Sequence, residues 1–128
     1  MLEDISNLTK LLNRKDILPV GYLRRNSIYY SFVSYINHTI ALFIGEDYDD
    51  VALFIKRSHS ELMKLKVKNE CSEEYFSLCE QYLKKLSIYL YKNELLSDFG
   101  IEMLHKCYNI ILWNDDVILE PIKGSLKH

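Results

Sequence analysis

The clearest structural signal in the sequence is the segment SEEYFSLCEQYLKKLSIYLYK, residues 72–92. Its apolar side chains recur at spacings of three and four residues, as they do along one face of a helix. They are Tyr75, Leu78, Cys79, Tyr82, Leu83, Leu86, Tyr89 and Leu90. Ser72 is suited to cap the first turn, and Glu80 precedes Lys84 in the order that favours an exposed ion pair. The pattern predicts an amphipathic helix roughly 31 Å long, around which the rest of the chain packs.

Helical spacing recurs towards the N-terminus. Residues 1–12 predict a short first helix, and residues 13–26, with a Pro-Val-Gly turn and clustered charge, predict an irregular loop. Residues 27–44 are rich in strand-favouring Tyr, Phe, Val, Ile and Thr. Their apolar positions nevertheless follow threes and fours better than strict alternation. We therefore expect a helix over residues 27–44, with a strand as the alternative.

A second helix is expected directly after this one. Gly45 is suited to the left-handed position that ends a helix, and Asp47 or Asp49 can cap the next. Apolar residues of that next helix line one side. They are Val51, Phe54, Ile55, Leu62 and Leu65.

The last apolar stripe follows Asn93 and predicts a further helix, capped by Asn93 or Ser97. Its members are Leu96, Gly100, Met103, Leu104, Cys107, Ile110 and Ile111. Gly100 in its interior indicates a close helix crossing, because glycine there otherwise only weakens the helix. Residues 114–128 are expected to form a turn and a short non-helical tail, with a short strand at residues 117–119 as an option. The predicted fold class is all-α: a single domain over residues 1–128, a compact bundle of about five helices.

Composition and charge restrict the classes of function. The chain has 128 residues, 48% of them hydrophobic, which is enough for one core. Its formal net charge of −2 provides no overall positive field for nucleic acid or an anionic membrane. No apolar run approaches the roughly 18 residues that span a bilayer. Glu3 and Asp4 stand where a signal peptide carries positive charge. We expect a cytoplasmic protein that contacts neither nucleic acid nor membrane directly.

No pattern nominates a catalytic residue, a metal site or a cofactor. Glu102 and His105 have the Glu-x-x-His spacing of helical di-iron bundles, but the second copy and the further glutamates of such sites have no counterpart in the sequence. The three cysteines stand at no fixed spacing, and a phosphate-binding loop, a nucleophile elbow and a Cys-x-x-Cys pair are all lacking. We expect no enzyme, and an enzyme with an unrecognised site is the third alternative.

One cluster of charge suggests a binding surface. We call Glu46, Asp47, Tyr48, Asp49 and Asp50 the acidic corner, because they join the two helices predicted around Gly45. Four carboxylates exceed what one N-cap and the helix dipole require, so at least one is expected to face outward. Carboxylates steer a cationic surface and tyrosine can anchor it, which makes the acidic corner a candidate interface for a basic partner.

The run IALFIGEDYDDVALFI, residues 40–55, resembles the small all-helical immunity proteins of bacterial polymorphic and contact-dependent toxin systems. Those families often have an apolar helix, a Gly-acid-acid corner and a second helix. The resemblance implies a cytoplasmic protein that binds a cognate nuclease-like toxin and blocks its active site without catalysis. The expected partner is a toxin with a basic surface. The alternative is a structural or regulatory bundle that self-associates as a homo-oligomer through an exposed Tyr and Ile face.

Overall fold

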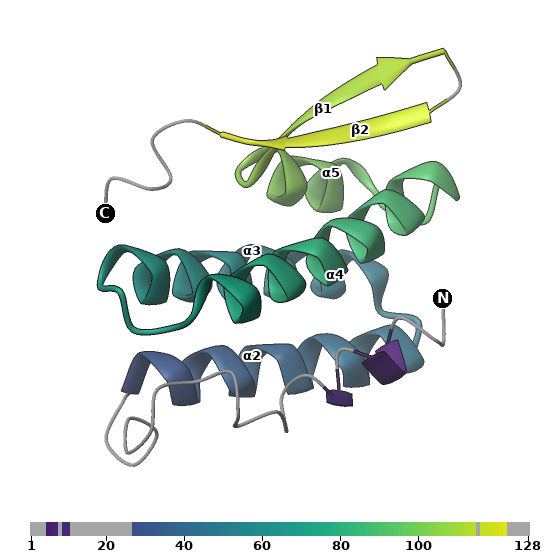
Figure 1. Cartoon of the computed structure of the whole chain (residues 1–128). Coiled ribbons are helices and arrows are strands. Elements are labelled where there is room, and N and C mark those ends of the chain that lie inside the picture. The colour runs from purple at the N-terminus through teal and green to yellow at the C-terminus, as the bar shows by residue number, and fades with distance from the viewer. Residues whose placement is uncertain (1–4, 8, 11–26, 115, 123–128) are drawn as a thin grey trace.

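The computed structural model describes residues 5–7, 9–10, 27–114 and 116–122 (Figure 1). Its elements in chain order are α2 (Ser27–Ile44), α3 (Tyr48–Val67), α4 (Glu73–Lys92), α5 (Asp98–His105), β1 (Tyr108–Trp113) and β2 (Asp116–Pro121). Residues 5–7 and 9–10 are also helical, in agreement with the predicted first helix. The predicted loop at residues 13–26 and the end of the tail, residues 123–128, lie outside the described residues.

The elements stack in layers (Figure 1). α2 lies on one side, α3 and α4 lie in the middle, and α5 followed by the β1–β2 hairpin lies on the other side. α3 packs most extensively against α2, and also against α5 and α4, while the hairpin packs against α4 and α5. Buried apolar side chains from Ile5 to Leu119 form one core. The helix with the most neighbours is therefore α3, although α4 carries the clearer sequence pattern.

The helix predicted over residues 72–92 is confirmed as α4. The Ser72 hydroxyl accepts a hydrogen bond from the Tyr75 amide at 3.1 Å, and the Lys84 Nζ atom lies 3.1 Å from the Glu80 carboxylate. Leu83 and Leu86 are buried in the core. Capping, ion pair and apolar face thus all follow the sequence pattern.

Residues 27–44 form helix α2, as their spacing predicts. Phe32 and Ile36 are fully buried, so the apolar stripe faces the core. The expected end of the helix is wrong in one respect, because Glu46, with a φ of 62°, takes the left-handed position in place of Gly45. The Gly45 amide still bonds the Ala41 carbonyl at 3.0 Å, and the Glu46 and Asp47 amides return to Phe43 and Leu42. The helix therefore runs one residue further before it turns.

The same left-handed ending recurs after α4, where Glu94 has a φ of 55°. Its amide bonds the Tyr91 carbonyl at 3.2 Å, and the Leu95 amide bonds the Leu90 carbonyl at 3.1 Å. A side chain with a Cβ destabilises this conformation by roughly 1–2 kcal/mol, whereas glycine adopts it freely at a smaller entropic cost. We expect Glu94→Gly to raise the free energy of unfolding by up to about 1 kcal/mol in urea denaturation. Glu94→Ala removes the same carboxylate but keeps a Cβ, so an equal gain from both variants would contradict this explanation.

The fold is mostly helical but not all-α, and the predicted last helix is the reason. Ser97 is the N-cap residue as expected, but α5 ends at His105. Ile110 and Ile111, assigned to that helix by their spacing, belong to β1, which pairs antiparallel with β2. The strand option at residues 117–119 is confirmed by β2. Trp113 pairs with Asp116, and Asn114 has the positive φ of 53° that two-residue hairpin loops require. Spacings of three and four over so few residues did not distinguish helix from strand.

Candidate functional site

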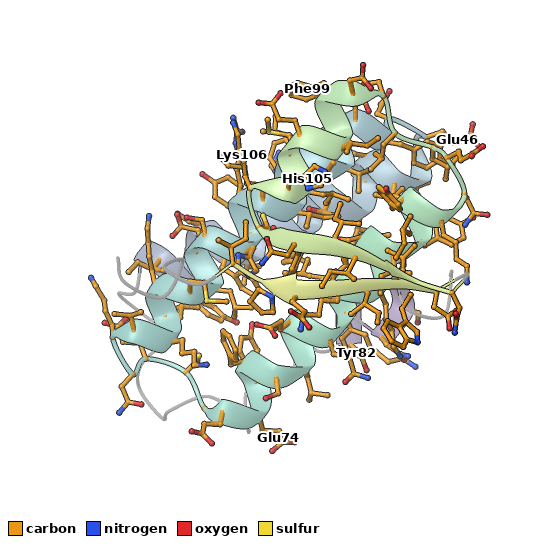
Figure 2. The ribbon with its side chains drawn as sticks, turned by 90° about the horizontal axis from the view of Figure 1, so that it is seen from above. Glu46, Glu74, Tyr82, Phe99, His105 and Lys106 are labelled. Carbon is orange, nitrogen blue, oxygen red and sulfur yellow. The ribbon has the colours of Figure 1, made fainter. Side chains whose placement is uncertain are left out.

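The structure brings the five residues of the acidic corner together between α2 and α3. With Leu95 they line a shallow hollow of about 320 Å³. Glu46, Asp47 and Asp50 are exposed, while Tyr48 and Asp49 are half-buried. Figure 2 shows Glu46 at one end of the molecule, with its carboxylate pointing outward. The predicted site residues thus form one surface, but they differ in what they contact.

Asp49 is held by the fold. Its carboxylate accepts a hydrogen bond from the Ser97 amide at 2.9 Å and another from the Ser97 hydroxyl. Gly100 allows this contact, because a Cβ there would lie 2.5 Å from the Asp49 Oδ1 atom. The expected close crossing at Gly100 is therefore confirmed, between α5 and the first turn of α3. Asp49 connects two helices and is not a free carboxylate for a partner.

Asp47 and Tyr48 have other roles at the corner. Asp47 stands at the N-cap position of α3 but makes no side-chain capping bond, so the expected cap is present by position only. The Tyr48 ring packs edge-to-face on Phe43, with centroids 5.9 Å apart, and Phe43 also contacts Tyr89 at 6.0 Å. Tyr48 is thus anchored to α2, and through Phe43 to α4, while part of its side chain stays exposed.

Three carboxylates of the corner are exposed. Within residues 5–7, 9–10, 27–114 and 116–122, Glu46, Asp47 and Asp50 form no ion pair. All three side chains are exposed to solvent. Outward-facing carboxylates at this turn are the feature that the sequence pattern predicted.

A second exposed surface was not predicted. Ile111, Trp113 and Ile118 alternate along the paired strands on one side of the hairpin, and we call them the hairpin face. They are 39%, 66% and 40% exposed, respectively. The available signal was Asn114-Asp115 between two apolar runs, which is typical of a hairpin loop.

The end of β1 and the start of β2 lie at the same end of the molecule as the acidic corner, as Figures 1 and 2 both show. The Lys92 Nζ atom at the end of α4 lies 3.8 Å from the Asp116 carboxylate beside the hairpin loop. Three residues after Lys92, Leu95 lines the hollow of the acidic corner. The short α4–α5 connection therefore lies between the two surfaces.

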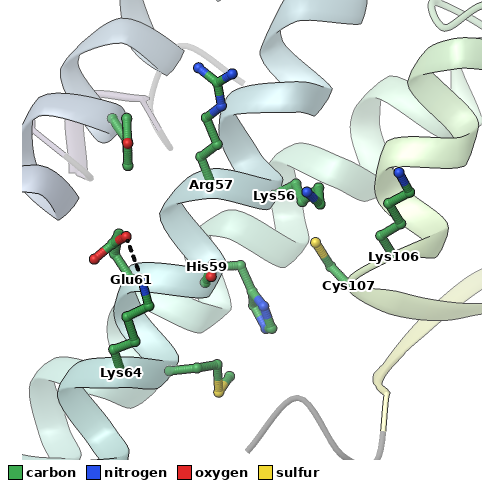
Figure 3. Close-up of a pocket in the computed structure, with 10 residues that line it drawn as sticks. Lys56, Arg57, His59, Glu61, Lys64, Lys106 and Cys107 are labelled. Carbon is green, nitrogen blue, oxygen red and sulfur yellow. Dashed lines mark hydrogen bonds and ion pairs between the residues drawn. The ribbon is translucent and has the colours of Figure 1, made fainter. Parts of the chain in front are cut away.

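A larger cavity of about 530 Å³ lies where α2, α3 and the junction of α5 with β1 meet (Figure 3). We call it the basic pocket, because Lys56, Arg57, Lys64 and Lys106 line it against one carboxylate, that of Glu61. These residues come from distant parts of the chain, so no single stretch of sequence indicates the pocket.

The buried thiols do not add a nucleophile. Cys107 lines the basic pocket, and its Sγ atom contacts the Met103 carbonyl at 3.8 Å. Burial raises the pKa of Cys107 to about 12 and that of Cys71 to about 11, so both thiols stay protonated at neutral pH. Burial likewise raises the pKa of Cys79. All three cysteines behave as small apolar core residues.

Among the described residues, no group of three or more His, Cys, Asp and Glu side chains could hold a metal ion. Glu102 and His105 are both exposed on α5. None of the helices in the described part of the chain is long and apolar enough to cross a membrane. No family model, curated protein or solved structure matches the chain.

Proposed function

We propose that this chain is a stoichiometric protein-binding domain, most concretely a cytoplasmic immunity protein that neutralises a nuclease-like toxin. The observation that supports the proposal is the acidic corner, where Glu46, Asp47 and Asp50 are exposed and carry no ion pair with any described residue. The resemblance of residues 40–55 to immunity proteins points to the same surface.

A nuclease must present positive charge where it binds phosphates. An inhibitor that covers this surface is favoured by carboxylates facing the same lysines and arginines, because charge-assisted hydrogen bonds across an interface are strong and charge complementarity speeds association. The hairpin face supplies what the acidic corner lacks, since Trp113, the last residue of β1, is a large exposed apolar side chain. Tryptophan is enriched among the residues that dominate binding energy.

The first test removes the corner's free charge without touching its structural carboxylate. A variant with Glu46→Ser, Asp47→Ser and Asp50→Ser keeps Asp49, which holds Ser97. We expect it to fold as the wild type does and to associate at least about tenfold more slowly at low salt with the protein encoded by the adjacent reading frame. Association rates measured against ionic strength should show a flatter salt dependence for the variant.

The matched control makes the same change of charge outside both surfaces, with Glu73→Ser, Glu74→Ser and Glu102→Ser, all exposed residues. It should keep most of the wild-type rate. Equal slowing by both triple variants would mean that only net charge matters and would contradict a role for the corner. A wild-type protein that does not bind the adjacent gene product at all would overturn the antagonist proposal.

The only tryptophan of the chain provides a second test. Trp113 is 66% exposed, so its fluorescence should resemble that of tryptophan in water, and partner binding should shift the emission to shorter wavelength. We expect Trp113→Ala to leave stability within about 0.5 kcal/mol of the wild type and to speed dissociation of the complex at least about tenfold. Unchanged emission in a saturated complex would exclude the hairpin face from the interface.

Self-association is the second candidate, and the exposed apolar hairpin face is the observation in its favour. Asp116 and Glu120 flank this face in the strand register, so two copies packed face to face would bring like charges together. Asp116 already lies 3.8 Å from the Lys92 Nζ atom, so it is the Glu120 carboxylate that favours a basic partner over a second copy. Light scattering across a range of protein concentrations distinguishes the two, because a self-associating bundle shows a mass that rises with concentration.

A further inference from the structure

The basic pocket concentrates positive charge in a chain whose formal net charge is −2. Lys56 and Arg57 reach it from α3, and Lys106 reaches it from the end of α5 (Figure 3). The charge of Lys64 is neutralised by Glu61, because the Lys64 Nζ atom lies 3.1 Å from the Glu61 carboxylate. In the described part of the chain, Lys56, Arg57 and Lys106 have no carboxylate partner. The Arg57 guanidinium also lies over the Phe54 ring, 5.0 Å from its centroid. Three cations around one cavity, none of them paired with a described carboxylate, favour an anionic ligand.

A buried polar side chain borders this region. His59 lines the pocket and is only 3% exposed, with its ring edge-to-face on Tyr108 at 5.2 Å. Its Nε2 atom is shielded from solvent and has no hydrogen-bond partner among the described residues. Burial lowers the pKa of this imidazole, Glu80 opposes that effect and Lys84 adds to it, so the ring is neutral at pH 7. Buried polar groups are rarely left unpaired, which makes the His59 side chain a polar feature in the wall of the pocket.

The size of the pocket restricts the ligand further. Its volume of about 530 Å³ lies within the range of roughly 300–1,000 Å³ that is typical of small-molecule sites. A phosphate ion alone would leave most of it empty, and Tyr35, Met63 and Cys107 provide walls for an organic group. We propose that the basic pocket binds a small organic phosphate, a phosphate monoester of about nucleotide size. Its phosphate would contact Lys56, Arg57 and Lys106, and its organic part would reach His59. This site does not depend on the proposed protein-binding role.

The test is a titration of the full chain with two organic phosphates, AMP and glucose 6-phosphate. Binding is monitored by the NMR signals of the backbone amides and histidine rings. Adenosine and glucose serve as uncharged probes. We expect at least one organic phosphate to cause saturable shifts in residues 56–60 and 106–108 and in the His59 imidazole. The matching uncharged probe should bind at least about tenfold more weakly, since it loses the charge-assisted hydrogen bonds.

Single substitutions distinguish binding in the pocket from a general attraction of anions to the positive charges of the protein. Lys56→Gln and Lys106→Gln should each weaken binding by about tenfold. Lys68→Gln makes the same change of charge at an exposed residue that does not line the pocket, and should leave affinity unchanged. His59→Phe keeps an aromatic ring but removes both ring nitrogens, and should also weaken binding. If this variant does not fold, the shift of the wild-type imidazole remains the test of His59.

Three outcomes would overturn the proposal. The first is the absence of saturable binding by both organic phosphates. The second is equal weakening by Lys68→Gln and Lys56→Gln, which would indicate attraction to net charge. The third is tight binding of a single-stranded oligonucleotide that neither organic phosphate displaces, which would make the lysines part of a polyanion surface.

Discussion

Leu83→Ala is expected to lower the free energy of unfolding by about 2–5 kcal/mol. Leu83 lies in the middle of α4 and is fully buried, so its truncation removes apolar area from the core and leaves a cavity that the neighbouring helices can only partly close. The measurement is urea denaturation followed by circular dichroism, with the midpoint and slope fitted together. The slope should stay unchanged, because the surface exposed on unfolding is nearly the same.

The control for this variant lies two residues away. Gln81 is exposed on the opposite face of α4, so Gln81→Ala should change stability by no more than about 0.5 kcal/mol. Both variants are equally compatible with a helix, since alanine has the best helix propensity. A Leu83→Ala loss as small as that of Gln81→Ala would show that this stripe does not face the core.

Gly100→Ala is expected to lower the free energy of unfolding by about 1–2 kcal/mol, although alanine is the better helix former. A Cβ at this position would lie 2.5 Å from the Asp49 Oδ1 atom and 2.9 Å from the Leu96 Cδ2 atom. Asp49 cannot retreat without weakening its bonds to Ser97. The clash therefore separates α5 from α3 or breaks the contact between Asp49 and Ser97.

Gly45→Ala is the matched control, because the nearest atom to its added Cβ is the Ala41 carbonyl oxygen at 3.5 Å, an ordinary contact. It should be neutral or stabilising by a few tenths of a kcal/mol. Thermal unfolding of the two variants side by side tests the difference. A Gly100→Ala variant as stable as Gly45→Ala would mean that α3 and α5 do not approach closely at this point.

Local sequence patterns were sufficient to predict helices α4 and α2. Ser72, the Glu80–Lys84 pair and the apolar stripe determine α4, because all three act within a few residues along the chain. In α2, apolar spacing outweighed the strand preference of Tyr, Val and Ile. The acidic corner was predictable for the same reason, since its five residues are consecutive and meet in any turn between two helices.

Tertiary contacts decided the hairpin, the contact between Asp49 and Ser97, and the basic pocket. Cys107, Ile110 and Ile111 fit a helical stripe, but α5 ends at His105, and pairing of Ile110 with Leu119 and of Ile111 with Ile118 places these two isoleucines in a strand. The hydrogen bond from Ser97 to Asp49 could not be predicted from sequence, because the two residues are 48 positions apart. The basic pocket needs α2, α3 and the end of α5 to meet. Sequence determines what each segment buries and where it turns, whereas packing determines which distant side chains share a surface or a cavity.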